Sequence, residues 1–257
     1  MGKSARAQNA RLVELRAQQA KAERRSKLMI AGATVGVVAI VVIALVIAAL
    51  QGGTDVTGQS STALDQATFA KVTSVPAASL DTVGAGASDN PPKTIDAPAL
   101  TKDGKPRVLY VGAEYCPYCA TERWPLVVAL SRFGTWNNLS ASFSAPAPEV
   151  NPNTATVSFH GATYSSQYVS FTGYETSTNK QTNGQWGKLD TLEGEDLALF
   201  QKFNAPPYVQ SSGAIPWSNL GGTSIQAGAS CNSAVILNKT HAEIATALSA
   251  PTTDIAK

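Results

Sequence analysis

The chain is poor in the residues that build disulfide scaffolds and hydrolytic or phosphate-binding sites. Its 257 residues include only three cysteines, two histidines and two methionines. Small secreted scaffolds are held together by several disulfides, and three cysteines are too few for that class. The sequence also has no glycine-rich loop typical of phosphate binding, no Ser/His/Asp set that indicates a catalytic triad, and no internal repeat.

Charge is also sparse, and it is unevenly distributed. Charged residues make up 15% of the chain, which has a formal net charge of +2. The first 27 residues hold eight basic and two acidic side chains, so this segment has a net charge of +6. Residues 28–50 are uncharged, so residues 51–257 have a net charge of −4. We therefore expect no basic surface for nucleic acid on the main part of the chain, and no nucleic-acid partner.

One long apolar run follows the basic segment. Leu28–Leu50 is 23 residues long without a charge, and a membrane-spanning helix needs about 20. Basic residues flank only its N-terminal end, so the positive-inside rule predicts a cytoplasmic tail over residues 1–27 and an extracytoplasmic main domain. A cleaved signal peptide is the alternative, although its apolar region is usually about 7–15 residues long. We predict a single-pass signal anchor in the cell membrane.

The remaining chain divides into a linker and one domain. Residues 51–62 are rich in Gly, Thr and Ser, which predicts a short linker before a domain over residues 63–257. Apolar periodicity predicts helices at 64–72, from just after Cys116 to about 130–132, at 192–203 and at 244–248, strands at 107–113, 154–160, 168–174 and 213–222, and a polar loop at 179–188. Gly134 is expected to end the second helix, and Thr240 with Glu243 forms a capping-box pattern before the last one. This order predicts a mixed α/β fold with a central sheet.

The motif Cys116-Pro117-Tyr118-Cys119 lies between an expected strand and an expected helix. A thiol attacks a disulfide only as the thiolate, and the free N–H groups at a helix N-terminus stabilise that anion. Cys116, at the helix start, is therefore the expected nucleophile. Cys119, one turn inside the helix, is the expected resolving thiol that attacks a mixed disulfide. Tyr118 is expected to shield the sulfur or to donate a hydrogen bond to it.

Two other interpretations of the motif remain open. A zinc site needs four ligands, and Cys231, His160 and His241 are the residues that would have to complete one. The chain has no second CxxC and no paired HxxxH, so we predict no metal. The other interpretation is a static structural disulfide between Cys116 and Cys119, without turnover.

Three further side chains have more than one interpretation. Glu114 is either a proton carrier for the resolving thiol or an exposed carboxylate. Arg123 either lines a cleft or pairs with Glu114 or Glu122. Cys231 is a buried free thiol, a third redox thiol or a partner in an intermolecular disulfide, and a free cysteine commonly packs as a small hydrophobic residue.

The segment around the motif also resembles a known family. Residues 112–134, with the sequence GAEYCPYCATERWPLVVALSRFG, are similar to the signature block of the DUF929 family of archaeal and actinobacterial proteins. The resemblance extends over most of residues 64–250, and it includes Gly104-Lys105-Pro106 and Ile215-Pro216-Trp217. That family in turn resembles the thioredoxin superfamily.

The resemblance implies a thioredoxin-like mixed sheet flanked by helices, with Cys116 and Cys119 as the active-site pair. It implies that Pro216, which follows Ile215, is the proline that faces the CxxC motif and holds the substrate backbone. Pro216, Ile215 and Tyr118 are therefore the candidate substrate-binding residues. About a hundred residues separate the motif from Pro216, more than in small thioredoxins, so residues 140–212 are expected to form an insertion or an elaborated sheet.

These features predict a membrane-anchored, extracytoplasmic thiol–disulfide oxidoreductase. Its expected partners are thiols and disulfides of exported proteins, a redox partner protein that exchanges electrons with it, and the lipid bilayer around residues 28–50. No cofactor is expected. The alternatives are a non-catalytic thioredoxin-like binding or envelope module with a static disulfide, and a metal-binding domain.

Overall fold

The computed structural model describes residues 55–257, which belong to one compact unit. The predicted cytoplasmic tail and signal anchor, residues 1–27 and 28–50, lie outside the described residues, as does the start of the predicted linker. Within residues 55–257, none of the helices combines the length and the apolar character needed to cross a bilayer.

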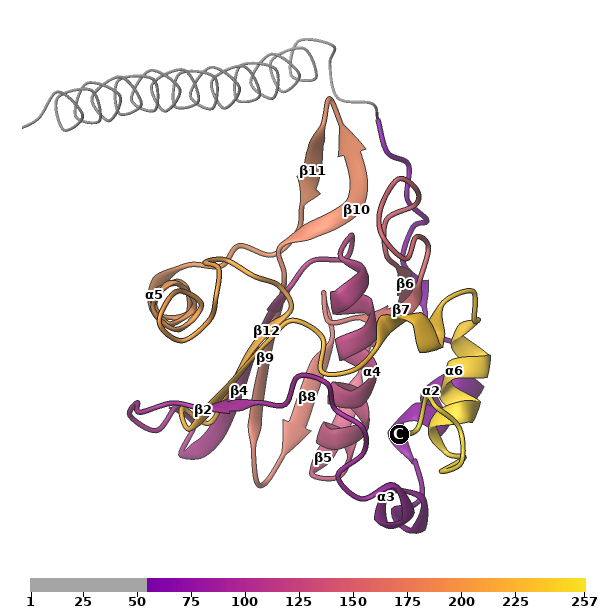
Figure 1. Cartoon of the computed structure of the whole chain (residues 1–257), viewed down its shortest axis with the longest axis horizontal. Helices are drawn as coiled ribbons and strands as arrows, with labels where there is room; N and C mark the ends of the chain where they lie inside the picture. Colours follow the sequence, from indigo (N-terminus) through magenta and orange to yellow (C-terminus); the bar gives the residue numbers. More distant parts are fainter. Residues whose placement is uncertain (1–54) are drawn as a thin grey trace, which may run out of the picture. The chain divides into compact units, whose positions relative to one another are not determined.

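A central mixed sheet organises this unit (Figure 1). Its strands are β2 (Lys93–Thr94), β3 (Thr101–Lys102), β4 (Lys105–Gly112), β9 (Ser170–Glu175), β12 (Trp217–Leu220) and β13 (Ser224–Ala227). The order across the sheet is β9-β4-β12-β13-β2, and β3 forms a hairpin with the start of β4. Strand β9 runs parallel to β4, whereas β12 is antiparallel to both β4 and β13. The predicted mixed α/β class is therefore confirmed.

Helices cover both faces of this sheet. Helix α4 (Pro117–Ser131) lies on one face and α5 (Gly194–Phe203) on the other (Figure 1). Strand β4 is buried on both faces, which explains why its sequence is a nearly continuous apolar run. Successive side chains alternate between the faces, so Tyr110 packs in the cluster under α4, whereas Leu109 packs in the cluster under α5.

A second layer of helices packs beyond α4. It contains α2 (Gln66–Thr73), α3 (Ala77–Val83), the 3₁₀ helix η1 (Ser233–Ile236) and α6 (His241–Leu248). Asp65 caps α2 by accepting a hydrogen bond from the Thr68 amide. The predicted capping box is present at α6, because Thr240 and Glu243 bond each other's backbone N–H groups. Local capping thus sets where these short helices begin.

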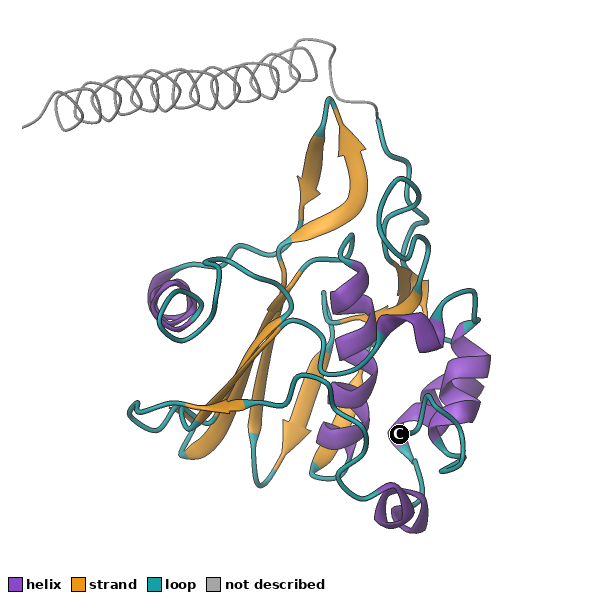
Figure 2. Ribbon diagram, in the orientation of Figure 1, coloured by secondary structure: helices purple, strands orange, loops and turns teal. Residues whose placement is uncertain are grey.

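Three smaller sheets complete the unit (Figure 2). Their strands pair as β1 (Thr62–Ala63) with β6 (Ser140–Phe143) and β6 with β7 (Ala155–Ser158), as β5 (Gly134–Asn137) with β8 (Thr163–Ser166), and as β10 (Ser177–Thr182) with β11 (Gln185–Lys188). The segment 140–212 is more than an insertion, because it also supplies β9 and α5 to the central layers.

Some expectations about single elements were wrong. Residues 179–188, predicted as a loop, form most of the β10–β11 hairpin, and its turn is Asn183-Gly184 with both φ angles positive. An Asn-Gly pair is a strong signal for such a tight hairpin turn. Gly134 does not end α4 in a left-handed conformation; it opens β5, where a Cβ would overlap the Ser165 carbonyl oxygen. Strand β12 starts at Trp217, later than predicted.

Part of the predicted linker contacts the folded unit. The backbones of Val56 and Gln181 exchange two hydrogen bonds, with N···O distances of 3.2 and 2.8 Å. Asp55 accepts a hydrogen bond from the Asn183 amide. The segment from residue 55 onward therefore runs along the β10–β11 hairpin before it reaches β1.

Candidate functional site

Cys116 occupies the N-cap of α4, as the sequence predicted. Its Sγ accepts a hydrogen bond from the Cys119 amide at 3.2 Å, which satisfies one of the free N–H groups of the first turn. The side chain is 4% exposed. A hydrogen bond from the Cys119 thiol, followed by the one from the Cys119 amide, lowers the pKa of Cys116 against the opposing effect of burial. The helix start therefore favours a thiolate at Cys116.

Cys119 has the opposite electrostatic character. It lies one turn inside α4 and is fully buried. Burial raises the pKa of its thiol well above the ordinary value, and the hydrogen bond to Cys116 adds to this shift. Both cysteines are free thiols. The environment thus favours the thiolate at Cys116 and the protonated thiol at Cys119.

The structure brings the X-Pro segment to the motif. The Ile215 carbonyl oxygen lies 3.8 Å from Cys116 Sγ, although the two residues are 99 positions apart. The Ile215–Pro216 peptide bond is cis. Tyr118 is half-exposed, and it lines a hollow of about 460 Å³ together with Ile215 and Cys231. Cys116, Tyr118, Ile215 and Cys231, all singled out from the sequence, thus gather at the N-terminal end of α4.

A buried ion pair lies beneath the motif. Arg123 donates to Glu175 through Nε at 2.8 Å and through Nη2 at 2.6 Å, and both side chains are fully buried. The same Nη2 donates to the Ala113 carbonyl oxygen at 2.7 Å, and that oxygen also accepts from the Cys116 amide. The guanidinium is therefore attached to the turn that carries Cys116.

The partner of Arg123 differs from the one predicted. The sequence suggested Glu114 or Glu122, but Glu114 accepts from Ser61, and Glu122 accepts from the amide and hydroxyl of Ser230. Glu175 comes from β9, and local spacing could not identify it. The available signal was an acidic residue at the end of an apolar strand pattern. Burial raises the pKa of Glu175, while Arg123 opposes that shift.

The histidines lie outside this cluster. His160 bonds Asp190 through Nδ1 at 2.7 Å, and the His241 ring bonds the carbonyl oxygens of Ser142 and Thr156. Within residues 55–257 there is no group of three or more His, Cys, Asp or Glu side chains arranged to hold a metal ion. Cys231 is half-buried, and burial raises the pKa of its thiol.

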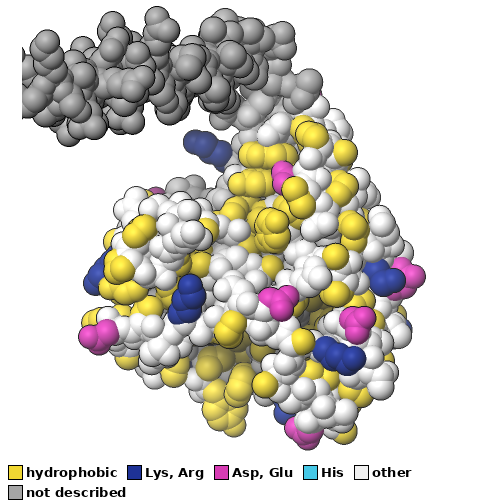
Figure 3. Space-filling view, in the orientation of Figure 1, with side chains coloured by type: hydrophobic (Ala, Val, Ile, Leu, Met, Phe, Trp, Pro, Cys, Tyr) yellow, Lys and Arg dark blue, Asp and Glu magenta, His cyan; other side chains and the backbone are white. Residues whose placement is uncertain are grey.

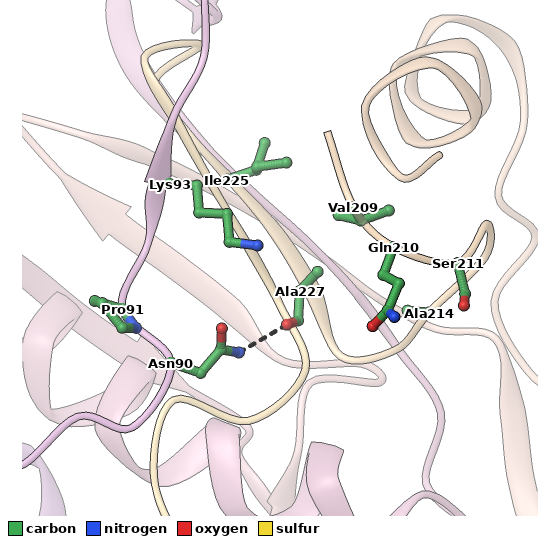
Figure 4. A pocket seen from close by; sticks show the side chains of 9 residues that line it. All are labelled: Asn90, Pro91, Lys93, Val209, Gln210, Ser211, Ala214, Ile225 and Ala227. Atoms are coloured by element: carbon green, nitrogen blue, oxygen red, sulfur yellow. Dashed lines mark hydrogen bonds between the residues drawn. The ribbon is translucent and has the colours of Figure 1, made fainter. Parts of the chain in front are cut away.

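Other surface features offer fewer reactive side chains. A hollow of about 300 Å³ lies between β2, β13 and the loop after α5, where Asn90 donates to the Ala227 carbonyl oxygen (Figure 4). Its lining combines Lys93 with amide, hydroxyl and aliphatic groups. On the face in Figure 3, acidic and basic side chains are scattered among neutral ones. The pair of cysteines with its buried support therefore remains the candidate site.

The architecture and site define a class before any comparison: a mixed α/β domain with a CxxC motif at a helix N-terminus. A family model described as a domain of unknown function, DUF929, matches residues 92–255, so the chain belongs to the DUF929 family. No curated protein and no solved structure matches the chain.

Proposed function

We propose that this protein is a thiol–disulfide oxidoreductase in which Cys116 attacks and Cys119 resolves. The observation that carries the proposal is the unequal environment of the two sulfurs. Cys116 Sγ accepts N–H donation at a helix N-terminus, whereas Cys119 is fully buried behind it. A static structural disulfide would gain nothing from a lowered pKa on one cysteine, but a nucleophile does.

We infer further that the fold is thioredoxin-like. The support is topological: β4, α4 and the parallel strand β9 form a β-α-β unit, and β12 and β13 follow as an antiparallel pair on the other side of β4. The proline loop before β12 approaches the motif through the Ile215 carbonyl oxygen. This arrangement is the one that the family resemblance implies, and in it Pro216, Ile215 and Tyr118 contact the substrate chain.

The proposed location is the outer side of the cell membrane. It rests on the sequence of residues 1–50, in which a basic segment precedes a charge-free run long enough to span a bilayer. In this location the substrates are exported proteins, where disulfides persist. A partner redox protein supplies or removes the electrons, and no bound cofactor takes part.

The reaction proceeds in two exchanges of sulfur bonds. The Cys116 thiolate attacks a substrate disulfide, forms a mixed disulfide and releases one substrate sulfur as a thiolate that takes up a proton. Cys119 then loses its proton and attacks Cys116 Sγ, which forms the Cys116–Cys119 disulfide and releases the second substrate sulfur. The protein is oxidised by two electrons and the substrate is reduced by two; the reverse sequence oxidises a dithiol.

The test measures thiol reactivity and partner capture in the full chain, purified in detergent. We expect alkylation of Cys116 to follow an inflection below the ordinary cysteine pKa of about 8.5. We also expect Cys119→Ser to accumulate mixed disulfides with exported proteins, because the resolving step is blocked. Cys116→Ser is the matched control, and it should capture none.

Two rival functions predict other results. A non-catalytic module with a static disulfide predicts that Cys116 titrates like a free thiol and that Cys119→Ser captures no more partner than Cys116→Ser. That outcome overturns the proposal. A metal-binding domain predicts stoichiometric zinc in the purified chain, lost when either cysteine is replaced.

A further inference from the structure

The resolving step poses an electrostatic problem, because Cys119 must become a thiolate while fully buried. Burial penalises the charged form of any group, and no solvent contacts this sulfur. The ionisable groups around it are Cys116 and Arg123 from α4, Tyr110 from β4 and Glu175 from β9. Arg123 is the cation among them. It follows Cys119 by four residues, so the two side chains share one face of the helix.

Arg123 also retains an unused donor. Its Nε and Nη2 bond Glu175 and Ala113, but Nη1 is buried without a hydrogen-bond partner. The Tyr110 hydroxyl in the same cluster is likewise buried without a partner. A buried donor without a partner is costly and rare in folded proteins. Arg123 Nη1 is one of ten buried polar side-chain atoms without a partner in residues 55–257, and it belongs to a side chain that shares a helix face with a thiol that must ionise.

A second buried arginine provides a comparison within the same chain. Arg107 binds Asp196 through Nη1 at 2.7 Å and Nη2 at 2.6 Å, and its Nε donates to Thr172. Each of its three nitrogens has a partner. Arg107 joins β4 to α5, on the face of the sheet away from α4. The spare donor therefore distinguishes Arg123, which lies under the motif, from Arg107.

We propose that Arg123 is a positioning residue for the resolving step, which stabilises the Cys119 thiolate through its charge and its free Nη1. Glu175 holds the guanidinium in place with two hydrogen bonds, and it also neutralises part of the positive charge. The Ala113 carbonyl oxygen ties the same guanidinium to the Cys116 turn. This inference rests on the proposed function, because it assigns a role within the second sulfur exchange.

The two exchanges can be timed separately. The reduced full chain in detergent, in a Cys231→Ser background, is mixed with an aromatic disulfide whose released thiolate is coloured. Attack by Cys116 releases the first coloured thiolate, and resolution by Cys119 releases the second. We expect Arg123→Lys to slow the second phase roughly tenfold, equivalent to one pKa unit in the Cys119 thiolate population. The first phase should stay within about twofold of its original rate, as a small change in local charge allows.

A substitution that is expected to change the rate of the second phase in the opposite direction separates this role from a structural one. Glu175→Gln leaves Arg123 in place but removes the neutralising charge, so we expect a faster second phase. Both substitutions weaken the same ion pair, so a purely structural role would change the second phase in the same direction in both variants. Arg107→Lys is the matched control for a conservative change in a buried pair, and it should alter neither phase.

The possible results have distinct meanings. An unchanged second phase in Arg123→Lys overturns the inference, and so does a slower second phase in both variants. If Arg123→Lys does not fold, as judged by circular dichroism, the inference is tested by the rate of the second phase in Glu175→Gln. A slower second phase in that variant overturns the inference. A missing first phase in the unsubstituted protein would instead overturn the proposed function.

Discussion

Gly112 illustrates how one missing methyl group shapes the site. It is the last residue of β4, and a Cβ at this position would overlap the hydroxyl and ring of Tyr110. The two residues lie on the same face of the strand because they are two positions apart. Tyr110 is fully buried beside Trp124 and Val127 of α4. Glycine therefore allows the tyrosine to extend toward the Cys116 turn.

We predict that Gly112→Ala lowers the free energy of unfolding by about 1–3 kcal/mol, the usual cost of overfilling a packed core. Tyr110 is fully buried in a cluster with α4 residues, so a new methyl group would crowd that packing. Urea denaturation monitored by tryptophan fluorescence measures the change. Adding Tyr110→Phe should restore part of the loss, since the hydroxyl is the nearest atom to the new methyl group. A single variant within about 0.5 kcal/mol of the wild type would contradict this account.

The β10–β11 hairpin reaches the site through an aromatic contact. Trp186 of β11 stacks on Tyr115, with ring centroids 4.5 Å apart and planes 7° from parallel. Tyr115 immediately precedes Cys116, so the hairpin packs against the turn that carries Cys116. A backbone hydrogen bond from Glu114 to Ser177 adds a second link at 2.9 Å.

We predict that Trp186→Ala destabilises the protein by at least about 0.5–1.5 kcal/mol, the value of an aromatic pair beyond its buried area. The loss should be local, with faster proteolytic cleavage in residues 183–188 than in the central strands. Limited proteolysis with mass spectrometry measures both rates. Trp186→Phe preserves a stacking ring and serves as the control. Equal cleavage in the alanine and phenylalanine variants would show that the stack does not hold the hairpin.

Two buried arginine pairs tie the layers of the described unit together. Arg107–Asp196 joins the sheet to α5, and Arg123–Glu175 joins α4 to the sheet. Burial by itself would raise the pKa of Asp196, but hydrogen bonds from Arg107 and Tyr174 outweigh it and lower the pKa. A carboxyl group with a lowered pKa stabilises the folded state above its ordinary pKa of about 4, and this stabilisation is lost as the pH falls through the lowered value.

Asp196→Asn should therefore be most destabilising near neutral pH, and the difference from the wild type should narrow as the pH falls below about 4. In that range the wild-type carboxyl also becomes neutral. Denaturant titrations at a series of pH values measure the difference. Asp254→Asn removes a carboxylate from an exposed position and controls for net charge. A difference that stays constant with pH would contradict the assignment of the lowered pKa to Asp196.

The sequence by itself determined the features that depend on a few neighbouring residues. The N-cap position of Cys116, a strand over most of residues 107–113 and the capping box of α6 were predicted and confirmed, because capping and periodicity act within one or two turns. The Asn183-Gly184 turn also depends only on neighbouring residues, so the sequence could have indicated the hairpin, but residues 179–188 were predicted as a loop.

Only the tertiary structure decided the long-range partners. Glu175 reaches Arg123 from 52 residues away, because β9 pairs in parallel with β4 and ends beside α4. The family resemblance implied that the Ile215–Pro216 segment faces the motif, and the structure gives the reason why Ile215 reaches Cys116: β12 pairs with β4 from the other side. Sheet order and register follow from the packing of the whole unit, which local spacing does not encode. The sequence therefore identified the two sulfurs, and the fold supplied the buried charges and the backbone that surround them.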